Sequence, residues 1–331
     1  MRFLSLSLLF AALTCVAQTP QASPTGAPQR QVFVGLNEVE KVSIDRFLGD
    51  PTNQPVHLSH GTLLTHTILG AGDPNQPGPQ AAVLEYRKQL ATAELMPGSR
   101  TPLDSSPDAY FFYVKSGEGR LDDGKQFWDL HSDIAILVPP SVAYRFLNTS
   151  HDKMLSMIML QWTGGPDAKS NLIVRDTHLL PWCEENAHWN NTSRCIFSAA
   201  DGLLQGERIY TVMLQPWAVS QPHSHTPGTE EIWTKISPGS IPILIGSDLR
   251  EMKESEAYLV PPTGKTDHSN INVSKDKTEW WIYVARGPAN PNAPPRPQGQ
   301  QGGRANANPN LSRDTQAATI AGKPLQKAEL Q

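Results

Sequence analysis

The sequence lacks any run of basic residues, because its 331 residues carry 28 Lys and Arg against 32 Asp and Glu, a net charge of −4. Nucleic acids and acidic membrane surfaces are bound through clustered positive charge, so nothing here favours either partner. After residue 17 no stretch approaches the ~20 apolar residues of a membrane-spanning helix. No strong amphipathic helical pattern occurs either, which disfavours a helical bundle.

Residues 1–17 have the pattern of a secretory signal peptide. Arg2 precedes an apolar run over residues 4–13, and Cys15 and Ala17 are the small residues expected before a cleavage site. A lipoprotein anchor at Cys15 is the alternative, although Thr14 fits a lipobox poorly. We therefore expect a periplasmic or secreted protein that is soluble once its leader is removed.

Cysteine is scarce: the chain has 3, and cleavage of the leader would leave Cys183 and Cys195. In an oxidising compartment two cysteines that close a short loop are most simply a disulfide, worth about 3 kcal/mol. The alternative is a thiolate metal site, for which only His188 is a nearby additional ligand. We expect the disulfide.

The hydrophobic fraction of 38% is low and 29 prolines are many, so part of the chain is expected to lie outside a packed core. Residues 18–50 read as a flexible leader and N-terminal extension. Residues 287–331 are rich in Gly, Pro, Asn and Gln and poor in aromatic and β-branched residues, so we expect a disordered tail.

Between these ends, short apolar runs alternate with Pro and Gly in two similar series, the pattern of an all-β sandwich or barrel. A shift of 120 residues places Pro102 on Pro222 and Pro107 on Pro227, which indicates an internal repeat. We expect a first barrel over residues 51–165, a linker over 166–205 that carries the disulfide, and a second barrel over 206–286.

The densest group of metal-ligand residue types is found at residues 221–233. On a strand His223 and His225 point the same way, and Glu230 and Glu231 follow within one short turn. His268 is a further candidate ligand downstream. Imidazole together with carboxylate suits a divalent transition ion such as Fe, Mn, Ni, Cu or Zn.

These stretches resemble the two sequence motifs of the cupin superfamily. In the first motif Trp217 stands near the place of a leading glycine, and the histidines and Gly239 fit. The second motif is matched by Pro262, Gly264, His268 and Asn272, with one extra residue before the histidine. The resemblance and the repeat together imply two tandem cupin barrels, each a double-stranded β-helix or jelly roll, and hence a bicupin.

The resemblance implies that His223, His225, one glutamate and His268 bind the metal. Spacing from His225 favours Glu230, whereas spacing to Gly239 favours Glu231; we choose Glu231 and expect the other glutamate to act as an outer acceptor or general base. Both glutamates are therefore candidate catalytic residues. Asn270 or Asn272 is expected to orient His268 by a hydrogen bond.

The first copy lacks such ligands. Leu103 and Ser105 stand where the second copy has its paired histidines, Tyr110 or Phe111 answers the acid, and Tyr144 or a neighbour answers the last histidine. We expect this barrel to be metal-free and to serve as a structural partner or as a binder of an apolar or aromatic molecule.

The resulting hypothesis is an extracytoplasmic metal-dependent enzyme that acts on a small organic molecule, such as a carbohydrate or an organic acid, by isomerase, lyase or decarboxylase chemistry. The alternatives are a cupin dioxygenase and a non-catalytic ligand-binding protein. Since an iron(II) site is hard to keep reduced outside the cytoplasm, redox-neutral chemistry is slightly favoured. The sequence is also compatible with a homo-oligomer.

Overall fold

The structure is a computed structural model that describes residues 43–165, 168–183, 190–204, 206–287 and 318–325. The expected signal peptide, Cys15 and His188 lie outside these residues. Within them, strands alternate with turns and four short 3-10 helices, and no α-helix occurs: Ile44–Phe47, Pro51–Asn53, Thr177–Leu179 and Ala199–Asp201. The prediction of an all-β fold is confirmed. No helix among these residues has the length and apolar character needed to span a bilayer.

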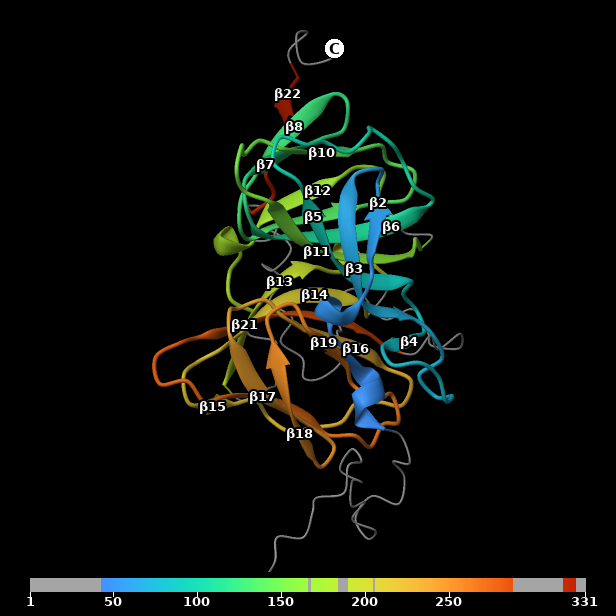
Figure 1. Ribbon diagram of the computed structural model, residues 1–331, viewed down its shortest axis with the longest axis vertical. Helices are drawn as coiled ribbons and strands as arrows, with labels where there is room; N and C mark the ends of the chain where they lie inside the picture. The colour runs from blue at the N-terminus through green and yellow to red at the C-terminus, as the bar shows by residue number, and fades with distance from the viewer. Residues whose placement is uncertain (1–42, 166–167, 184–189, 205, 288–317, 326–331) are drawn as a thin grey trace, which may run out of the picture. The chain divides into compact units, whose positions relative to one another are not determined.

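The first barrel consists of two sheets (Figure 1), whose strands pair antiparallel except for β4, which is parallel to β3. One runs β12-β9-β6-β11-β5-β3-β2, with β4 beside β3, and the other runs β10-β7-β8-β22. The strands are β2 (Val56–Ser59), β3 (Leu63–Ala71), β4 (Ala82–Leu84), β5 (Gln89–Leu95), β6 (Asp108–Ser116), β7 (Gly119–Asp122), β8 (Gln126–Leu130), β9 (Ile134–Val138), β10 (Arg145–Asn148), β11 (Leu155–Thr163), β12 (Ile173–Asp176) and β22 (Lys323–Pro324).

The second barrel repeats the plan with sheets β1-β19-β16-β21-β14-β13 and β15-β20-β17-β18. Its strands are β1 (Leu48–Gly49), β13 (Asn191–Phe197), β14 (Arg208–Leu214), β15 (Ala218–Val219), β16 (Glu230–Lys235), β17 (Ser240–Ile245), β18 (Asp248–Lys253), β19 (Ala257–Leu259), β20 (His268–Asn272) and β21 (Glu279–Arg286). The sequence of strands follows that of the first barrel, so the tandem-barrel prediction is confirmed.

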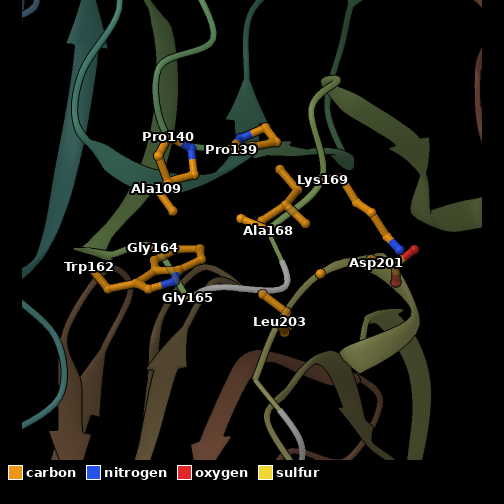
Figure 2. A pocket seen from close by; sticks show the side chains of 12 residues that line it. Ala109, Pro139, Pro140, Trp162, Gly164, Gly165, Ala168, Lys169, Asp201 and Leu203 are labelled. Atoms are coloured by element: carbon orange, nitrogen blue, oxygen red, sulfur yellow. The ribbon is translucent and has the colours of Figure 1, made fainter.

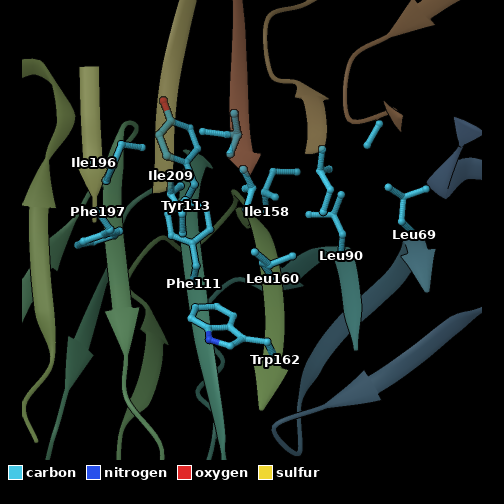
Figure 3. Close-up of a cluster of buried hydrophobic side chains, with 14 of the residues drawn as sticks. Leu69, Leu90, Phe111, Tyr113, Ile158, Leu160, Trp162, Ile196, Phe197 and Ile209 are labelled. Carbon is cyan, nitrogen blue, oxygen red and sulfur yellow. The ribbon is translucent and has the colours of Figure 1, made fainter. Parts of the chain in front are cut away.

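Strand β6 explains how the larger sheet of each barrel is buried on both faces. Alternate side chains of a strand point to opposite faces, so Tyr110 and Phe112 enter the core of the first barrel while Phe111 and Tyr113 point outward. The outward pair packs in a shared hydrophobic cluster with residues of the second barrel, such as Ile209 (Figure 3). Each large sheet is therefore covered on both sides, and the two barrels share a core.

Three segments that we expected outside the barrels contribute strands to them. The N-terminal extension supplies β1 to the second barrel, and the expected linker supplies β12 to the first barrel and β13 to the second. The tail prediction is wrong for residues 318–325, because β22 pairs with β8 (Figure 1) and Ala318 is fully buried. The Trp128 indole N–H donates to the Ile320 carbonyl at 2.9 Å, which holds this segment on the first barrel.

The disulfide prediction is not supported, because no disulfide joins Cys183 and Cys195, which are both buried. The backbone of Cys183 pairs with Ser193, two residues before Cys195, so the two thiols lie close together. A hydrogen bond to Cys183 and burial raise the pKa of the Cys195 thiol well above its usual value.

A small hollow lies where the first barrel meets the segment that follows it, beside Trp162, Pro140 and Leu203 (Figure 2). Its volume is about 10 Å³. Because that is room for roughly one water molecule, the hollow is a packing defect and not a ligand site.

Candidate metal centre

The two sequence motifs meet because their turns pack against each other. Gly264 has a φ of +76° and no room for a side chain, since an added Cβ would lie 2.4 Å from the Pro227 ring. The Gly228 N–H donates to the Pro262 carbonyl at 2.9 Å. These contacts are possible only with glycine at position 264, and they bring the loop that carries the paired histidines against the start of β20.

Four side chains converge at this meeting point: His223, His225, Glu231 and His268. One donor atom from each lies within 4.8 Å of the others. The backbones of His223 and His268 form an isolated antiparallel bridge, with the His268 N–H donating to the His223 carbonyl at 3.1 Å. Glu231 comes from β16, on the opposite sheet of the barrel.

The spacing of these donors suits a single ion. Glu231 Oε2 lies 2.7 Å from His225 Nε2, and Glu231 Oε1 lies 2.9 Å from His268 Nε2. Two donors at about 2.1 Å from one ion, at right angles to each other, would lie roughly 3 Å apart. Three imidazoles and one carboxylate therefore stand where a divalent transition ion would take them all as ligands.

Glu231 is fully buried and is held by four partners. Besides the two histidines, the Trp233 indole N–H donates to Oε1 at 2.7 Å and the Tyr283 hydroxyl donates to Oε2 at 3.1 Å. Burial alone would raise the pKa of this carboxyl, but His268 and His225 outweigh burial and hold the pKa well below its usual value. The carboxyl is therefore an anion, which a metal ligand must be.

Glu230 has a different role, although it is the preceding residue. Its carboxylate accepts from Arg87 Nη1 at 2.5 Å and from the backbone N–H groups of Glu85 and Tyr86 at 2.7 and 2.9 Å. Arg87 also donates to Glu207 at 2.8 Å. Glu230 thus lies in a buried ionic contact between the barrels, and our expectation that it acts as an outer acceptor or general base at the cluster is wrong.

The two asparagines also differ from expectation. Asn270 accepts from the Tyr258 hydroxyl at 2.9 Å. Asn272 donates to the carbonyls of Leu214 and Lys277 at 3.1 and 2.7 Å, so it fixes the loop before β21. The Nδ1 atom of His268 is buried and has no hydrogen-bond partner in the described part of the chain, so neither amide orients the ring.

Sequence reasoning missed Trp233 and Tyr283 as partners of Glu231. The signal was present for Trp233, because residues two apart on a strand point to the same face and Trp233 follows Glu231 at that spacing. No spacing in the sequence signals Tyr283. It lies on β21, which becomes a neighbour of β16 only in the folded sheet, where Tyr283 pairs with Trp233.

In the first barrel aromatic side chains occupy the corresponding place. Asp104 and Tyr144 form the bridge that corresponds to the His223–His268 bridge. His60 fills the space between Tyr144 and Tyr110: its Nε2 lies 2.6 Å from the Tyr144 hydroxyl, and its ring meets that of Tyr110 edge-on at 5.0 Å. Burial lowers the pKa of His60 to about 4. A neutral histidine among aromatic rings therefore stands where the second barrel has its cluster.

Trp217 adds a local strain to the second barrel. It has a φ of +55°, whereas Gly98 occupies the corresponding turn of the first barrel with a φ of +66°. The cupin motif has a glycine here, and a bulky side chain in the left-handed region carries a backbone cost. The tryptophan is also 65% exposed, so packing does not offset that cost.

Comparison with protein families agrees with this geometry. Residues 91–160 match the family described as the cupin domain, which is the first barrel and not the one with the histidine cluster. A comparison with curated proteins finds no match.

Solved structures match over both barrels. AerE from Microcystis aeruginosa superposes with a TM-score of 0.54 at 12% identity, covering 73% of this chain and 100% of AerE. The oxalate decarboxylase of Lactobacillus farciminis, in its formate complex, gives 0.54 at 11% identity and covers 75% and 88%. The 7S globulin of Momordica charantia gives 0.53 at 8% identity and covers 72% and 84%.

The chain has a bicupin fold. Since these identities are low, the likeness concerns the fold and leaves the chemistry to the residues of this chain. In this two-barrel chain the four candidate metal ligands lie in the second barrel. The exposed fractions of their side chains indicate from which side a ligand approaches them. The His225 side chain is 22% exposed, whereas the side chains of His268 and Glu231 are 2% and 1% exposed. The Nε2 atoms of His223 and His225 are themselves buried, so the exposed part of the His225 ring marks the side on which solvent comes nearest to the cluster.

Proposed function

We propose that the second barrel is a divalent-metal site at which the protein converts a small oxygen-bearing organic molecule, an organic acid or a sugar, by redox-neutral isomerase, lyase or decarboxylase chemistry. The observation that carries this proposal is the buried convergence of His223, His225, Glu231 and His268 on one point. Such an ion polarises a carbonyl or carboxylate oxygen and stabilises the negative charge that develops on it.

The ligand types of the cluster support a reactive site rather than a structural one. Structural metal sites are usually rich in cysteine, whereas this cluster consists of three histidines and one glutamate. Trp233 and Tyr283 fix the orientation of Glu231, so the carboxylate does not have to reorganise when an ion or a substrate binds.

The rest of the barrel interior excludes water from the cluster. Tyr258 and Trp281 are fully buried, and Ile243, Ile245 and Val260 belong to the same hydrophobic cluster as Trp233. Charge interactions are stronger in such a low-dielectric setting. With Glu230 engaged by Arg87, a group on the substrate itself or on bound water is the proton carrier in this proposal.

The structural neighbours give this proposal a direction. One is an oxalate decarboxylase, whose name identifies a small dicarboxylic acid as its substrate, and it has a similar two-barrel fold. Low identity makes this an analogy of fold, so we propose organic acids as the first substrates to test. The proposal also places the protein outside the cytoplasm, on the basis of the leader pattern in residues 1–17.

The test is a conversion assay with metal-free protein that is reloaded with one ion at a time. Carboxylic acids of two to four carbons and simple aldoses are incubated with and without oxygen, and products are followed by NMR while an electrode records oxygen. Conversion without oxygen uptake, absent in His223→Ala, is the expected result. Stoichiometric oxygen uptake would establish the dioxygenase alternative, and saturable binding without conversion would replace catalysis with ligand binding.

A further inference from the structure

A second cavity lies between the two barrels, away from the histidine cluster. Its volume is about 300 Å³, which is large enough for a small organic molecule. Strand β6 of the first barrel contributes Tyr113 and Lys115, while β13, β14 and β21 of the second contribute Arg194, Thr211 and Trp280. None of the four cluster residues lines it.

Two lining residues have buried polar atoms that the protein leaves unsatisfied. Arg194 and Thr211 face each other across β13 and β14, so their side chains are neighbours on one face of the sheet. Arg194 Nε and Thr211 Oγ1 are buried, and neither has a hydrogen-bond partner among the described residues. Thr211 is only 1% exposed. A buried polar atom without a partner destabilises a fold, so two such atoms beside one cavity indicate an absent acceptor.

The charges of the cavity wall indicate an anion. Lys115 pairs with Glu254 at 2.6 Å, and His178 lies 2.7 Å from Asp133. Arg194 donates from Nη1 to the Thr177 carbonyl at 3.1 Å, and no carboxylate in the described part of the chain lies within ion-pair distance of its guanidinium. The Asp133 carboxylate lines the same cavity and interacts with Arg194 at longer range. The guanidinium is therefore the cation of this wall that is not in direct contact with a carboxylate among the described residues.

Aromatic rings supply an apolar surface beside this charge. Arg194 lies over the Trp182 ring at 4.1 Å and near the Trp280 ring at 5.9 Å, and these two indoles stack on each other. Tyr113 also lines the cavity, and its hydroxyl donates to Asp133. A guanidinium fixed against two indoles keeps its orientation, because the rings restrict its rotation.

We propose that this cavity is a second binding site, for a small organic carboxylate with a ring or short apolar body. The carboxylate accepts hydrogen bonds from Arg194 Nε and Thr211 Oγ1, and the apolar body packs on Trp280 and Tyr113. The site is independent of the metal centre and of the function proposed for it.

The experiment measures binding of benzoate to the metal-free full chain by isothermal titration calorimetry, with uncharged benzamide as the matched probe. Thr211→Val keeps the shape of the side chain and removes the hydroxyl. Thr234→Val is its control, since Thr234 is fully buried with an equally unsatisfied Oγ1 but does not line the cavity. Arg194→Gln removes the charge, and His223→Ala disables the metal centre.

We expect saturable benzoate binding in the wild type, about tenfold weaker binding in Thr211→Val, and unchanged binding in Thr234→Val and His223→Ala. Both valine variants should melt at a higher temperature, because each loses an unsatisfied buried hydroxyl, so a folding defect is not the cause of weaker binding. Arg194→Gln should abolish binding. Absence of benzoate binding in the wild type, equal affinity for benzamide, or equal loss in both valine variants would each overturn the proposal.

Discussion

Replacement of Glu230 by alanine should destabilise the protein strongly while leaving its metal content unchanged. Glu230 accepts three hydrogen bonds, one of them from Arg87, and both side chains are buried. Removal of one partner of a buried ion pair typically costs about 3–5 kcal/mol, because the remaining charge is uncompensated. Glu207 still neutralises Arg87 at 2.8 Å, so we expect the lower end, about 3 kcal/mol.

The assay combines urea unfolding of the metal-free protein with elemental analysis of the loaded protein. Glu231→Gln is the matched control, since it changes the neighbouring glutamate conservatively and should abolish metal binding. If Glu230→Ala lost the metal, or cost under about 1 kcal/mol, the division of roles between the two glutamates would be refuted.

Three further predictions follow from single contacts. Trp233→Phe removes the indole donor to Glu231 and should weaken metal binding roughly 10–100-fold. Trp281→Phe is the control and should not weaken it, because its buried N–H has no hydrogen-bond partner among the described residues. Equal losses of affinity in metal titrations of the two variants would contradict this prediction. Because the pKa of His60 is lowered to about 4 in the folded protein, the unfolded chain takes up a proton at this residue at a higher pH than the folded protein does. The contribution of neutral His60 to the free energy of unfolding is therefore complete above pH 6.5 and is lost as the pH falls to about 4. In His60→Asn the free energy of unfolding, measured by urea titration at each pH, should lack up to about 3 kcal/mol of that loss. A pH profile equal to that of the wild type would contradict this prediction. Deletion of residues 318–331 should expose the Trp128 indole and lower the melting temperature, and an unchanged transition would show that the segment contributes nothing.

The fold was predictable because its signals are local and repeated. Strand-length apolar runs between prolines and glycines specify an all-β chain, and the match of Pro102 with Pro222 revealed the second copy. The histidine motif was predictable for a similar reason, since His223 and His225 share a face of the chain through their spacing alone. His268 required the second motif, whose Gly264 fixes the turn that brings it to the cluster.

The remaining features depend on contacts that a linear pattern does not specify. Motif spacing could not show which of Glu230 and Glu231 is the metal ligand. Adjacent residues of a strand face opposite sides, and only the contact of Glu230 with Arg87, which is distant in sequence, shows that Glu230 faces away from the histidines. The return of residues 318–325 to the first barrel was missed because the composition of a whole segment hides one short buried stretch around Ala318. No motif spacing marks His60, and its place among aromatic rings depends on the folded barrel.

The measurement that tests the central claim most directly is elemental analysis of protein purified without added metal, for the wild type beside His268→Ala and Ser105→Ala. We predict about one equivalent of a divalent transition metal in the wild type and in Ser105→Ala, and little in His268→Ala with its fold retained by circular dichroism. Equal metal content in all three proteins, or no metal in the wild type even after reloading, would contradict the assignment of the centre.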